Sequence, residues 1–144
     1  MTISETHVGR SYPPTPPYRI SRAKIAEFAS ALGDANPAYS GVTPVAPPTF
    51  AVVISSQAWG SLFDDPELGL ALHRTVHGDQ RFTWTRPLRE GDDVTAVLTI
   101  EKVRNRGMAD MVTVRVDLST LAGEHVCSAT STFLHSHPTE GAVA

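Results

Sequence analysis

The sequence has a single cysteine and no apolar run long enough to cross a bilayer. One thiol, Cys127, cannot form an internal disulfide, and this sparing use of cysteine suits a reducing compartment. The most apolar stretch, Phe50 to Phe63, is too short to span a membrane and contains Gln57. The first ten residues, MTISETHVGR, include an acid and no apolar run, unlike a signal peptide. We therefore expect a soluble, cytoplasmic protein with no membrane partner.

An excess of positive charge is also missing. The formal net charge is −3 and the pI is about 6.0. Proteins that bind nucleic acid usually present a basic stripe, so we expect no nucleic-acid partner. A length of 144 residues fits one domain with a substantial core. We predict a single domain over residues 1–144, with a proline-rich arm at 1–20 and a frayed tail at 135–144.

Two helices are predicted in the first half of the chain. Residues 11–20 contain four prolines, which predict an extended arm or an edge segment. Ser21 can cap a helix whose apolar residues recur every three or four positions until Gly33 ends it. A second helix is predicted to begin at residue 48 or 49 and to end at Asp64. It is apolar on nearly all sides, which indicates a buried helix.

Four strands are predicted in the second half, at residues 76–85, 94–101, 112–118 and 125–134. Apolar and polar residues alternate along them, and short turns join neighbouring runs. This pattern is typical of an antiparallel meander with one buried face. A curved antiparallel sheet wrapped around a central buried helix is the hot-dog fold, of the α+β class. A generic two-layer α+β sandwich is the alternative.

Three motifs carry a resemblance to a known family. They are GDANPAY at residues 33–39, APPTF at 46–50 and HGDQRFTWTRPLREGDDV at 77–94. Together they resemble the MaoC-like hot-dog hydratases and dehydratases, and the resemblance covers most of the chain. These enzymes act on the enoyl or 3-hydroxyacyl thioesters of CoA or acyl carrier protein. The combination of D-x-N-P with a downstream R-P-x-x-x-G-D is the more specific part of the resemblance.

The loop motif departs from the active members of that family at one position. Active members read G-D-x-N-P-x-H, and their aspartate and histidine hold or activate the water. Asp34 matches the catalytic aspartate, and Asn36 and Pro37 also match, but Tyr39 stands at the histidine position. Histidine changes charge near neutral pH, whereas a phenol with a pKa near 10 is a poor base there. The resemblance therefore implies one candidate catalytic residue, Asp34, and half of the catalytic pair.

A second departure lies at the start of the buried helix. Active members have a His-Gly pair there, and amides at that helix end polarise the thioester carbonyl. Pro47 and Pro48 occupy the matching positions, and a proline nitrogen has no hydrogen to donate. The resemblance implies substrate-binding residues around both segments, namely Asn36, Pro47, Pro48, Thr49, Phe50 and Val53.

Both departures resemble the non-catalytic subunit of the mycobacterial (3R)-hydroxyacyl-ACP dehydratase and its actinobacterial relatives. That resemblance implies a subunit that binds an acyl-CoA or an acyl carrier protein thioester, needs no cofactor and is inactive alone. It would form a homodimer, or a heterodimer with a catalytic hot-dog subunit. The alternative is a self-sufficient (R)-specific enoyl-thioester hydratase or dehydratase that uses Asp34, assisted by Tyr39 or His77. A hot-dog thioesterase is disfavoured, because the buried helix has no carboxylate to activate water.

The candidate residues also have plainer interpretations. Asp34 and Asn36 are common turn residues whose side chains cap nearby amides. Tyr39 is of a type that more often packs than catalyses. His77, with Asp79 to orient it, is a weak candidate for a replacement base, and a histidine at a strand end more often bonds the backbone.

Two further groups remain open. His135 and His137 form an H-x-H pair with no third ligand nearby in the sequence, so we predict no metal site. The arginines of the strand region form either ordinary solvated surface or a basic mouth for the phosphates of CoA or the acidic face of a carrier protein. These are Arg81, Arg86, Arg89, Arg104 and Arg106.

Overall fold

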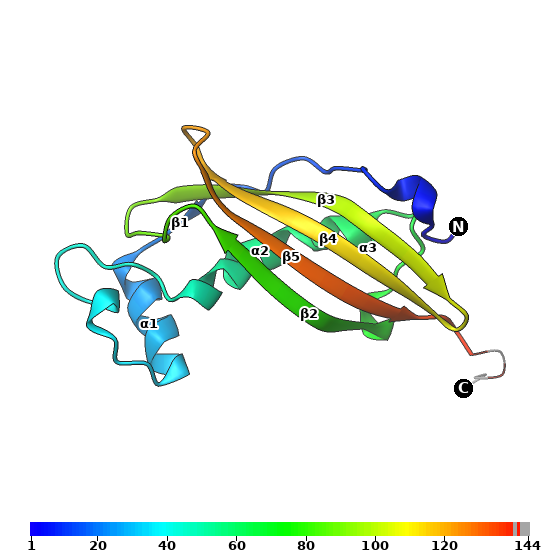
Figure 1. Ribbon diagram of the computed structural model, residues 1–144, viewed down its shortest axis with the longest axis horizontal. Helices are drawn as coiled ribbons and strands as arrows, with labels where there is room; N and C mark the ends of the chain where they lie inside the picture. Colours follow the sequence, from blue (N-terminus) through cyan, green and yellow to red (C-terminus); the bar gives the residue numbers. More distant parts are fainter. Residues whose placement is uncertain (140, 142–144) are drawn as a thin grey trace.

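The structure is a computed structural model that describes residues 1–139 and Gly141. Its sheet contains the four long strands β2 (Thr75–Trp84), β3 (Asp93–Arg106), β4 (Ala109–Thr120) and β5 (His125–Ser136). A two-residue strand, β1 (Tyr18–Arg19), completes an antiparallel sheet in the order β1-β3-β4-β5-β2. The sheet curls around helix α2 (Ala51–Ala58), as Figure 1 shows. All four predicted strands are present, and β3 and β4 extend further than the alternation alone indicated.

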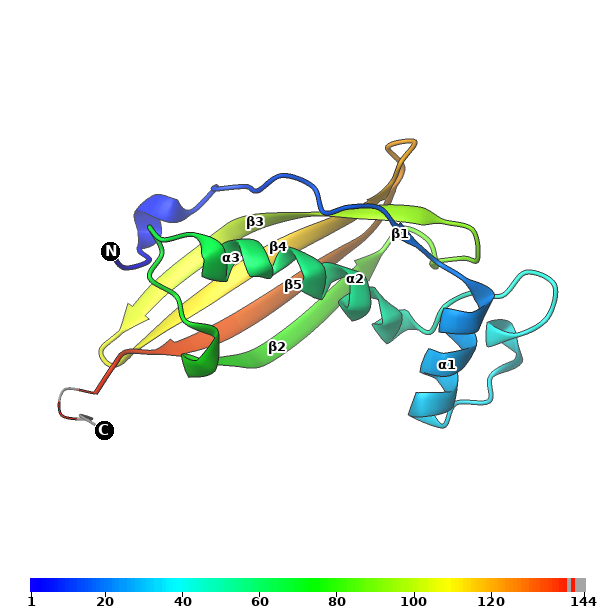
Figure 2. The same cartoon turned by 180° about the vertical axis from the view of Figure 1, so that it is seen from behind.

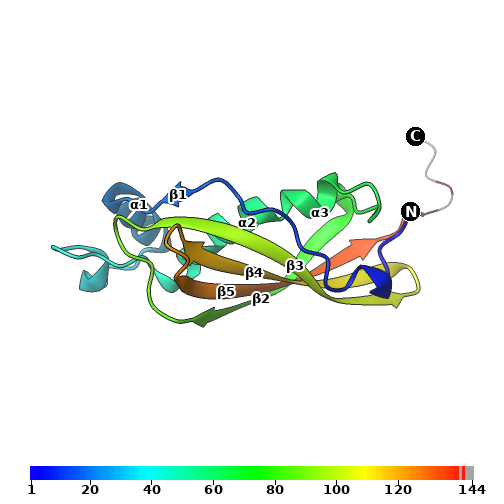
Figure 3. The same ribbon diagram turned by 90° about the horizontal axis from the view of Figure 1, so that it is seen from above.

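The concave face of the sheet holds the core. Every second side chain along β4 is buried, from Asp110 to Leu118, and β3 and β5 show the same alternation apart from their bulges. Helix α2 lies against this face, and both helices α2 and α3 (Gly60–Asp64) are on one side of the sheet (Figures 2 and 3). This arrangement is the predicted hot-dog fold, in which apolar burial by the sheet and by α2 stabilises both.

The second predicted helix is not continuous. It consists of a 3₁₀ turn, η3 (Pro48–Phe50), followed by α2 and α3, which are separated at Trp59. The backbone N–H of Trp59 donates to Ser56, and that of Leu62 donates to Trp59, so both bonds have the tighter three-residue spacing. The helix is also less buried than predicted. Gln57 is exposed, and only one side of α2 packs against the sheet.

The first helix, α1 (Arg22–Leu32), agrees with its predicted ends. The Ser21 hydroxyl accepts a hydrogen bond from the Lys24 N–H, and Gly33 ends the helix with φ of +67°. Only Ile25 and Ala29 are fully buried in α1. The helix lies beyond the end of the sheet, together with the turn η2 (Pro37–Tyr39) (Figure 1).

The two edges of the sheet differ. The segment between the 3₁₀ turn η1 (Glu5–His7) and β1 runs along β3, where the Gly9 N–H donates to Ile100 and the Tyr12 N–H donates to Leu98. The proline-rich arm therefore covers this edge. At the other edge, β2 pairs only with β5, and its second side has no partner strand in the described chain. An unpaired edge of this length is a surface on which another strand can pair.

The tail begins later than predicted. His135 and Ser136 belong to β5, and His135 is only 4% exposed, because its ring packs under the turn η4 (Leu72–Arg74) and accepts a hydrogen bond from the Ala71 N–H. Residues 140 and 142–144 of the predicted frayed tail lie outside the described residues. No helix in the described part of the chain is long and apolar enough to cross a membrane.

Candidate functional site

The loop after α1 is built by its own polar side chains. The Asp34 carboxylate accepts a hydrogen bond from the Asn36 N–H at 3.0 Å, and the Asn36 side-chain oxygen accepts one from the Ala38 N–H at 3.0 Å. These two bonds turn the chain into η2, which begins at Pro37. Both side chains are exposed. The turn interpretation therefore holds locally.

Tyr39 lies beside Asp34 at the end of this turn. Partial burial raises the pKa of its phenol above the usual value, and the negative charge of Asp34 raises it further. The phenol therefore stays protonated at neutral pH. It can donate a hydrogen bond, but it cannot accept the proton that a hydration reaction must remove from water.

Tyr39 borders an apolar hollow of about 260 Å³. The hollow joins three parts of the chain that are distant in sequence, namely the loop, the start of the central helix and the end of β2. Its lining residues are Tyr39, Val45, Ala46, Pro48, Trp84 and Pro87. On the other side of Tyr39, Asp34 and Asn36 line a shallower hollow against α1, of about 400 Å³. The phenol thus separates an apolar space from the polar loop.

The start of the central helix lacks hydrogen-bond donors at its two prolines, as the sequence predicts. Pro47 and Pro48 offer no N–H, and the Pro47 carbonyl accepts the hydrogen bond from the Phe50 N–H at 2.9 Å. The first amide of this segment that can donate belongs to Thr49, which is exposed. The nearest preceding amides, those of Val45 and Ala46, already donate to the carbonyls of Ala38 and Leu88.

The structure divides the predicted substrate-binding residues into two groups. Pro48 shares the apolar hollow with Tyr39. Phe50 is 2% exposed and packs edge-on against Phe28, with ring centroids 5.2 Å apart. Phe50 and Val53 border a different surface hollow between α1 and α2. Phe50 is therefore a core residue that ties α1 to the sheet.

His77 lies far from the loop within one chain. Trp84, which shares the hollow with Tyr39, is seven residues further along β2, and seven residues of strand span roughly 23 Å. The His77 ring packs against Trp59 with centroids 4.9 Å apart, and its Nε2 is 3.1 Å from the Gln80 side-chain oxygen. The structure therefore does not bring His77 together with Asp34 of the same chain.

The R-P-x-x-x-G-D motif holds the β2–β3 turn together. Arg86 donates to both carboxylate oxygens of Asp92, at 2.8 and 3.1 Å, and also to Glu124. Burial alone would raise the pKa of Asp92, but Arg86 and the Arg89 N–H hold it below its usual value. The motif is thus structural, and it positions Pro87 in the wall of the apolar hollow.

The predicted arginine cluster is dispersed. Arg86 and Arg89 lie at the loop end of the sheet, whereas Arg104 and Arg106 lie on β3 beside the β3–β4 hairpin, at the opposite end. Arg81 lies on β2, where its Nε is 3.4 Å from the Asp79 carboxylate. These five side chains do not form one mouth around the hollow.

Sequence reasoning missed the contribution of β2 to the hollow. The alternation places Trp84 only within a strand, yet its side chain lines the same hollow as Tyr39. Its position directly before the Arg86-Pro87 turn was the available signal, since that turn folds against the loop. Asp110 was also missed. It is fully buried and its carboxylate lies 2.8 Å from His137 Nε2, although no three such residues in the described chain are arranged to hold a metal ion.

Solved structures share this fold. A chain of the HadBC (3R-hydroxyacyl-ACP dehydratase) complex from Mycobacterium tuberculosis superimposes with a TM-score of 0.76 at 27% identity, over 89% of this chain and 96% of that one. A MaoC-like dehydratase superimposes with a TM-score of 0.81 at 24% identity, over 92% of this chain and 43% of that one. The fold and its loop thus define a MaoC-like hot-dog protein of the hydratase and dehydratase class.

Sequence comparison places the chain more narrowly. Residues 6–129 match the model of the family described as FAS1-like, dehydratase domain region, and the chain belongs to this family. It is 54% identical over 138 residues to the UPF0336 protein PPA1896 of Cutibacterium acnes, which covers 96% of this chain and 97% of that protein. It is 45% identical over 138 residues to the UPF0336 protein SCO4636 of Streptomyces coelicolor, covering 90% and 92%.

Proposed function

We propose that this chain is the non-catalytic, acyl-thioester-binding subunit of a (3R)-hydroxyacyl-thioester dehydratase or enoyl-thioester hydratase. The observation that carries the proposal is Tyr39, a protonated phenol at the position of the family's histidine and beside Asp34. Hydration requires a group that accepts a proton from water and returns one to carbon. The protonated phenol of Tyr39 cannot accept that proton at neutral pH, so Asp34 has no partner base in this loop. The start of the central helix also has prolines, Pro47 and Pro48, at the positions where active members have amides that polarise the thioester carbonyl.

Binding is supported by the shape of the site. The hollow between Tyr39, Pro48 and Trp84 is apolar, as a surface that accommodates an acyl chain or the arm of its carrier would be. The bound group would be an acyl-CoA or an acyl carrier protein thioester. The chain itself needs no metal or cofactor for this role.

A second hot-dog chain supplies the chemistry in this proposal. The free edge of β2 offers a strand for edge-to-edge pairing, and the loop with Asp34 and Asn36 is exposed in a single chain. A partner that contains D-x-N-P-x-H would provide the aspartate and histidine. A homodimer is the alternative assembly. The HadBC complex, a structural neighbour, contains two different subunits by its name.

The rival function is a hydratase that is active by itself. Asp34 favours it, because this carboxylate is exposed and lies beside the phenol of Tyr39. In this case Asp34 would act as the acid and base, with Tyr39 assisting. His77 could assist only from a neighbouring chain, given its distance along β2.

The deciding experiment is hydration of a short enoyl-CoA, followed by loss of the conjugated thioester absorbance. The purified chain is assayed alone, with a second hot-dog subunit that contains D-x-N-P-x-H, and as the Asp34→Asn variant in both settings. Asparagine keeps the oxygen that accepts from the Asn36 N–H, so the turn is preserved. We expect no turnover alone, turnover with the partner, and little effect of Asp34→Asn. Turnover by the chain alone that Asp34→Asn abolishes would establish the rival.

A further inference from the structure

The outer face of the sheet has an apolar row close to the β3–β4 hairpin. The strand register places Met111 opposite Leu134, and Leu134 opposite Val76. Phe133 and His135, which flank Leu134 on β5, point into the core, so the row faces outward. Val76 is 63% exposed and Leu134 is 39% exposed. Exposed apolar side chains grouped in this way are typical of a surface that another molecule covers.

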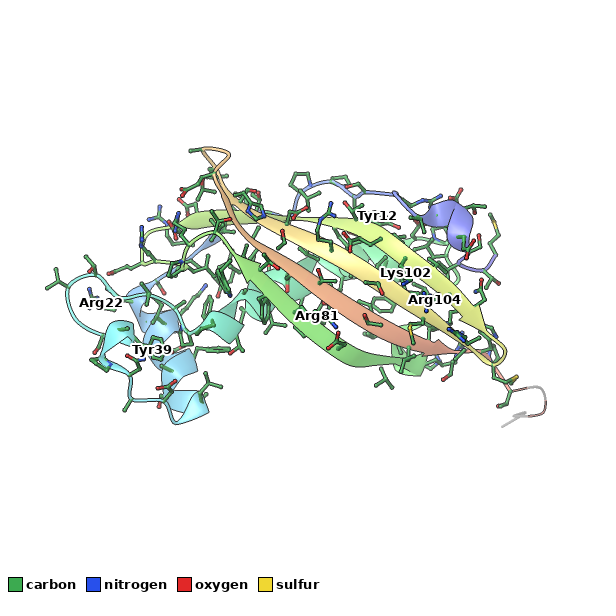
Figure 4. The ribbon with its side chains drawn as sticks, in the orientation of Figure 1. Tyr12, Arg22, Tyr39, Arg81, Lys102 and Arg104 are labelled. Atoms are coloured by element: carbon green, nitrogen blue, oxygen red, sulfur yellow. The ribbon has the colours of Figure 1, made fainter. Side chains whose placement is uncertain are left out.

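Three cations border this row. Lys102, Arg104 and Arg106 occupy alternate positions on β3 after its bulge, and all three are exposed. None of the residues opposite them on β4 is charged, and Arg104 lies opposite Met111 of the apolar row. Figure 4 shows Lys102 and Arg104 on the face of the sheet turned away from α2. We call the apolar row and these three cations the outer-face patch.

The three cations of the outer-face patch form no ion pair with a carboxylate of the described residues. Among the described residues, no carboxylate lies within 4.0 Å of Lys102, Arg104 or Arg106. Six other arginines are paired with carboxylates, whereas Lys24, Arg74 and Arg89 have no such ion pair among the described residues; the six are Arg10, Arg19, Arg22, Arg81, Arg86 and Arg115. Three uncompensated positive charges on one strand are a marked segregation in a chain of net charge −3.

The charge and the apolar side chains of the patch favour a protein partner over a second copy of this chain or a nucleic acid. A second copy of the chain would place like charges near one another across a two-fold axis, which is unfavourable. A nucleic acid would be repelled by the net charge of −3 and would find no aromatic side chain on the row to stack on. An apolar centre with a charged rim is instead the usual composition of a protein–protein interface.

We infer that the outer-face patch binds an acidic protein, whose carboxylates face Lys102, Arg104 and Arg106 and whose apolar contact covers Met111, Leu134 and Val76. The inference rests on the proposed function only for the identity of that protein, which is the carrier protein that bears the acyl thioester. It thereby favours a carrier-bound substrate over CoA for this chain.

The position of the patch is compatible with this role. Within one chain Lys102 and Arg104 of the patch lie far from Tyr39, toward the opposite end of the sheet (Figure 4). Antiparallel pairing of two β2 edges would place the start of one β2 strand beside the end of the other. The patch of this chain would then lie beside the loop end of the partner subunit, where the catalytic pair is expected. This chain would dock the carrier, and its partner would perform the reaction.

The test measures binding of purified apo acyl carrier protein, which bears no thioester, to the complex of this chain with its catalytic partner. The double variant Lys102→Glu/Arg104→Glu is compared with wild type and with Lys24→Glu/Arg89→Glu. The control pair changes the net charge by the same amount but lies at the loop end. We expect the patch variant to weaken binding about tenfold or more and the control about twofold at most, with affinity falling as salt rises.

Three outcomes would overturn the inference. They are no binding of the carrier protein by the wild-type complex, equal losses in both double variants, and a loss confined to the control. Turnover of enoyl-CoA by the same complexes is recorded in parallel. The patch variant should leave it within about twofold, because CoA requires no protein docking. Turnover of enoyl-CoA thus tests the proposed function, and carrier binding tests this inference. If carrier binding overturns the inference while turnover is intact, the proposed function still stands.

Discussion

The two ends of the sheet use polar residues in opposite ways. At the loop end, Asp34 and Asn36 are exposed and satisfy amides within their own turn. At the hairpin end, Asp110 is fully buried and His135 is 4% exposed, and their partners come from distant segments. The residues of the loop motif are thus held by local bonds, whereas the buried ionisable groups join segments that are distant in the sequence. Local bonds therefore build the loop end, whereas contacts between segments that are distant in the sequence build the hairpin end.

The largest expected effect tests how the loop end is attached to the sheet. Phe50 is 2% exposed and contacts the rings of Phe28 and Tyr18, so it connects α1 to α2 and β1. Replacing a buried phenylalanine with alanine leaves a cavity, and we expect Phe50→Ala to lower the free energy of unfolding by about 3–5 kcal/mol. Urea denaturation measures the change.

The matched control for this prediction is Leu32→Ala in α1. Leu32 is 53% exposed, so its truncation should change the free energy of unfolding by about 0.5 kcal/mol or less. Equal effects of the two substitutions would show that α1 is not anchored through Phe50. The loop end would then be attached to the sheet in some other way.

A smaller effect is expected at the hairpin end, and it depends on pH. His135 Nε2 accepts from the Ala71 N–H at 3.1 Å, so the neutral ring has its proton on Nδ1, which lies 3.9 Å from Asp110. Burial lowers the pKa of His135, and the positive charge of Arg74 lowers it further, while Asp110 opposes both. His135 therefore binds a proton less readily in the folded protein than in the unfolded chain.

The sign of the pH dependence follows from this difference. The contribution of neutral His135 to stability is fully present above the unfolded pKa of about 6.5 and is lost as the pH falls through the lower folded pKa. We expect stability to fall between pH 7 and 5, and His135→Gln to flatten that fall. An unaltered slope in His135→Gln would contradict the assignment.

Most of the fold could be predicted because its signals are local. The alternation along β3, β4 and β5, the cap at Ser21 and the left-handed Gly33 each depend on neighbouring residues, and each was placed correctly. The break at Trp59 was missed, because a tightened turn has no sequence pattern distinct from a continuous helix. The burial of His135 was missed because it depends on Ala71, which is distant in the sequence.

The candidate site was less predictable for the same reason. The sequence locates Asp34, Asn36 and Tyr39, since one short motif contains all three. It does not show that Trp84 shares a hollow with Tyr39, nor that Phe50 packs in the core, because both depend on how β2 and α1 pack against the central helix. His77 is the clearest case. Its residue type suits a base, yet strand geometry keeps it remote from Asp34 in one chain.

The smallest expected effect concerns Tyr39 and separates binding from chemistry at the loop end. Tyr39→Phe removes only the hydroxyl from a ring that lines the apolar hollow. If the phenol takes no part in the reaction, the complex with a catalytic partner should keep its rate of enoyl-thioester hydration within about twofold, and the free energy of unfolding should change by about 0.5 kcal/mol or less.

If Tyr39 assists Asp34, the same substitution should reduce kcat by about 100-fold or more, as loss of an acid–base group does, with KM nearly unchanged. The informative companion is Tyr39→His, which restores the D-x-N-P-x-H motif with Asp34 in place. We expect a gain of slow turnover in the chain alone, limited by the missing amide donors at Pro47 and Pro48. Absence of any gain would indicate that the helix start, more than the residue at position 39, keeps this loop inactive.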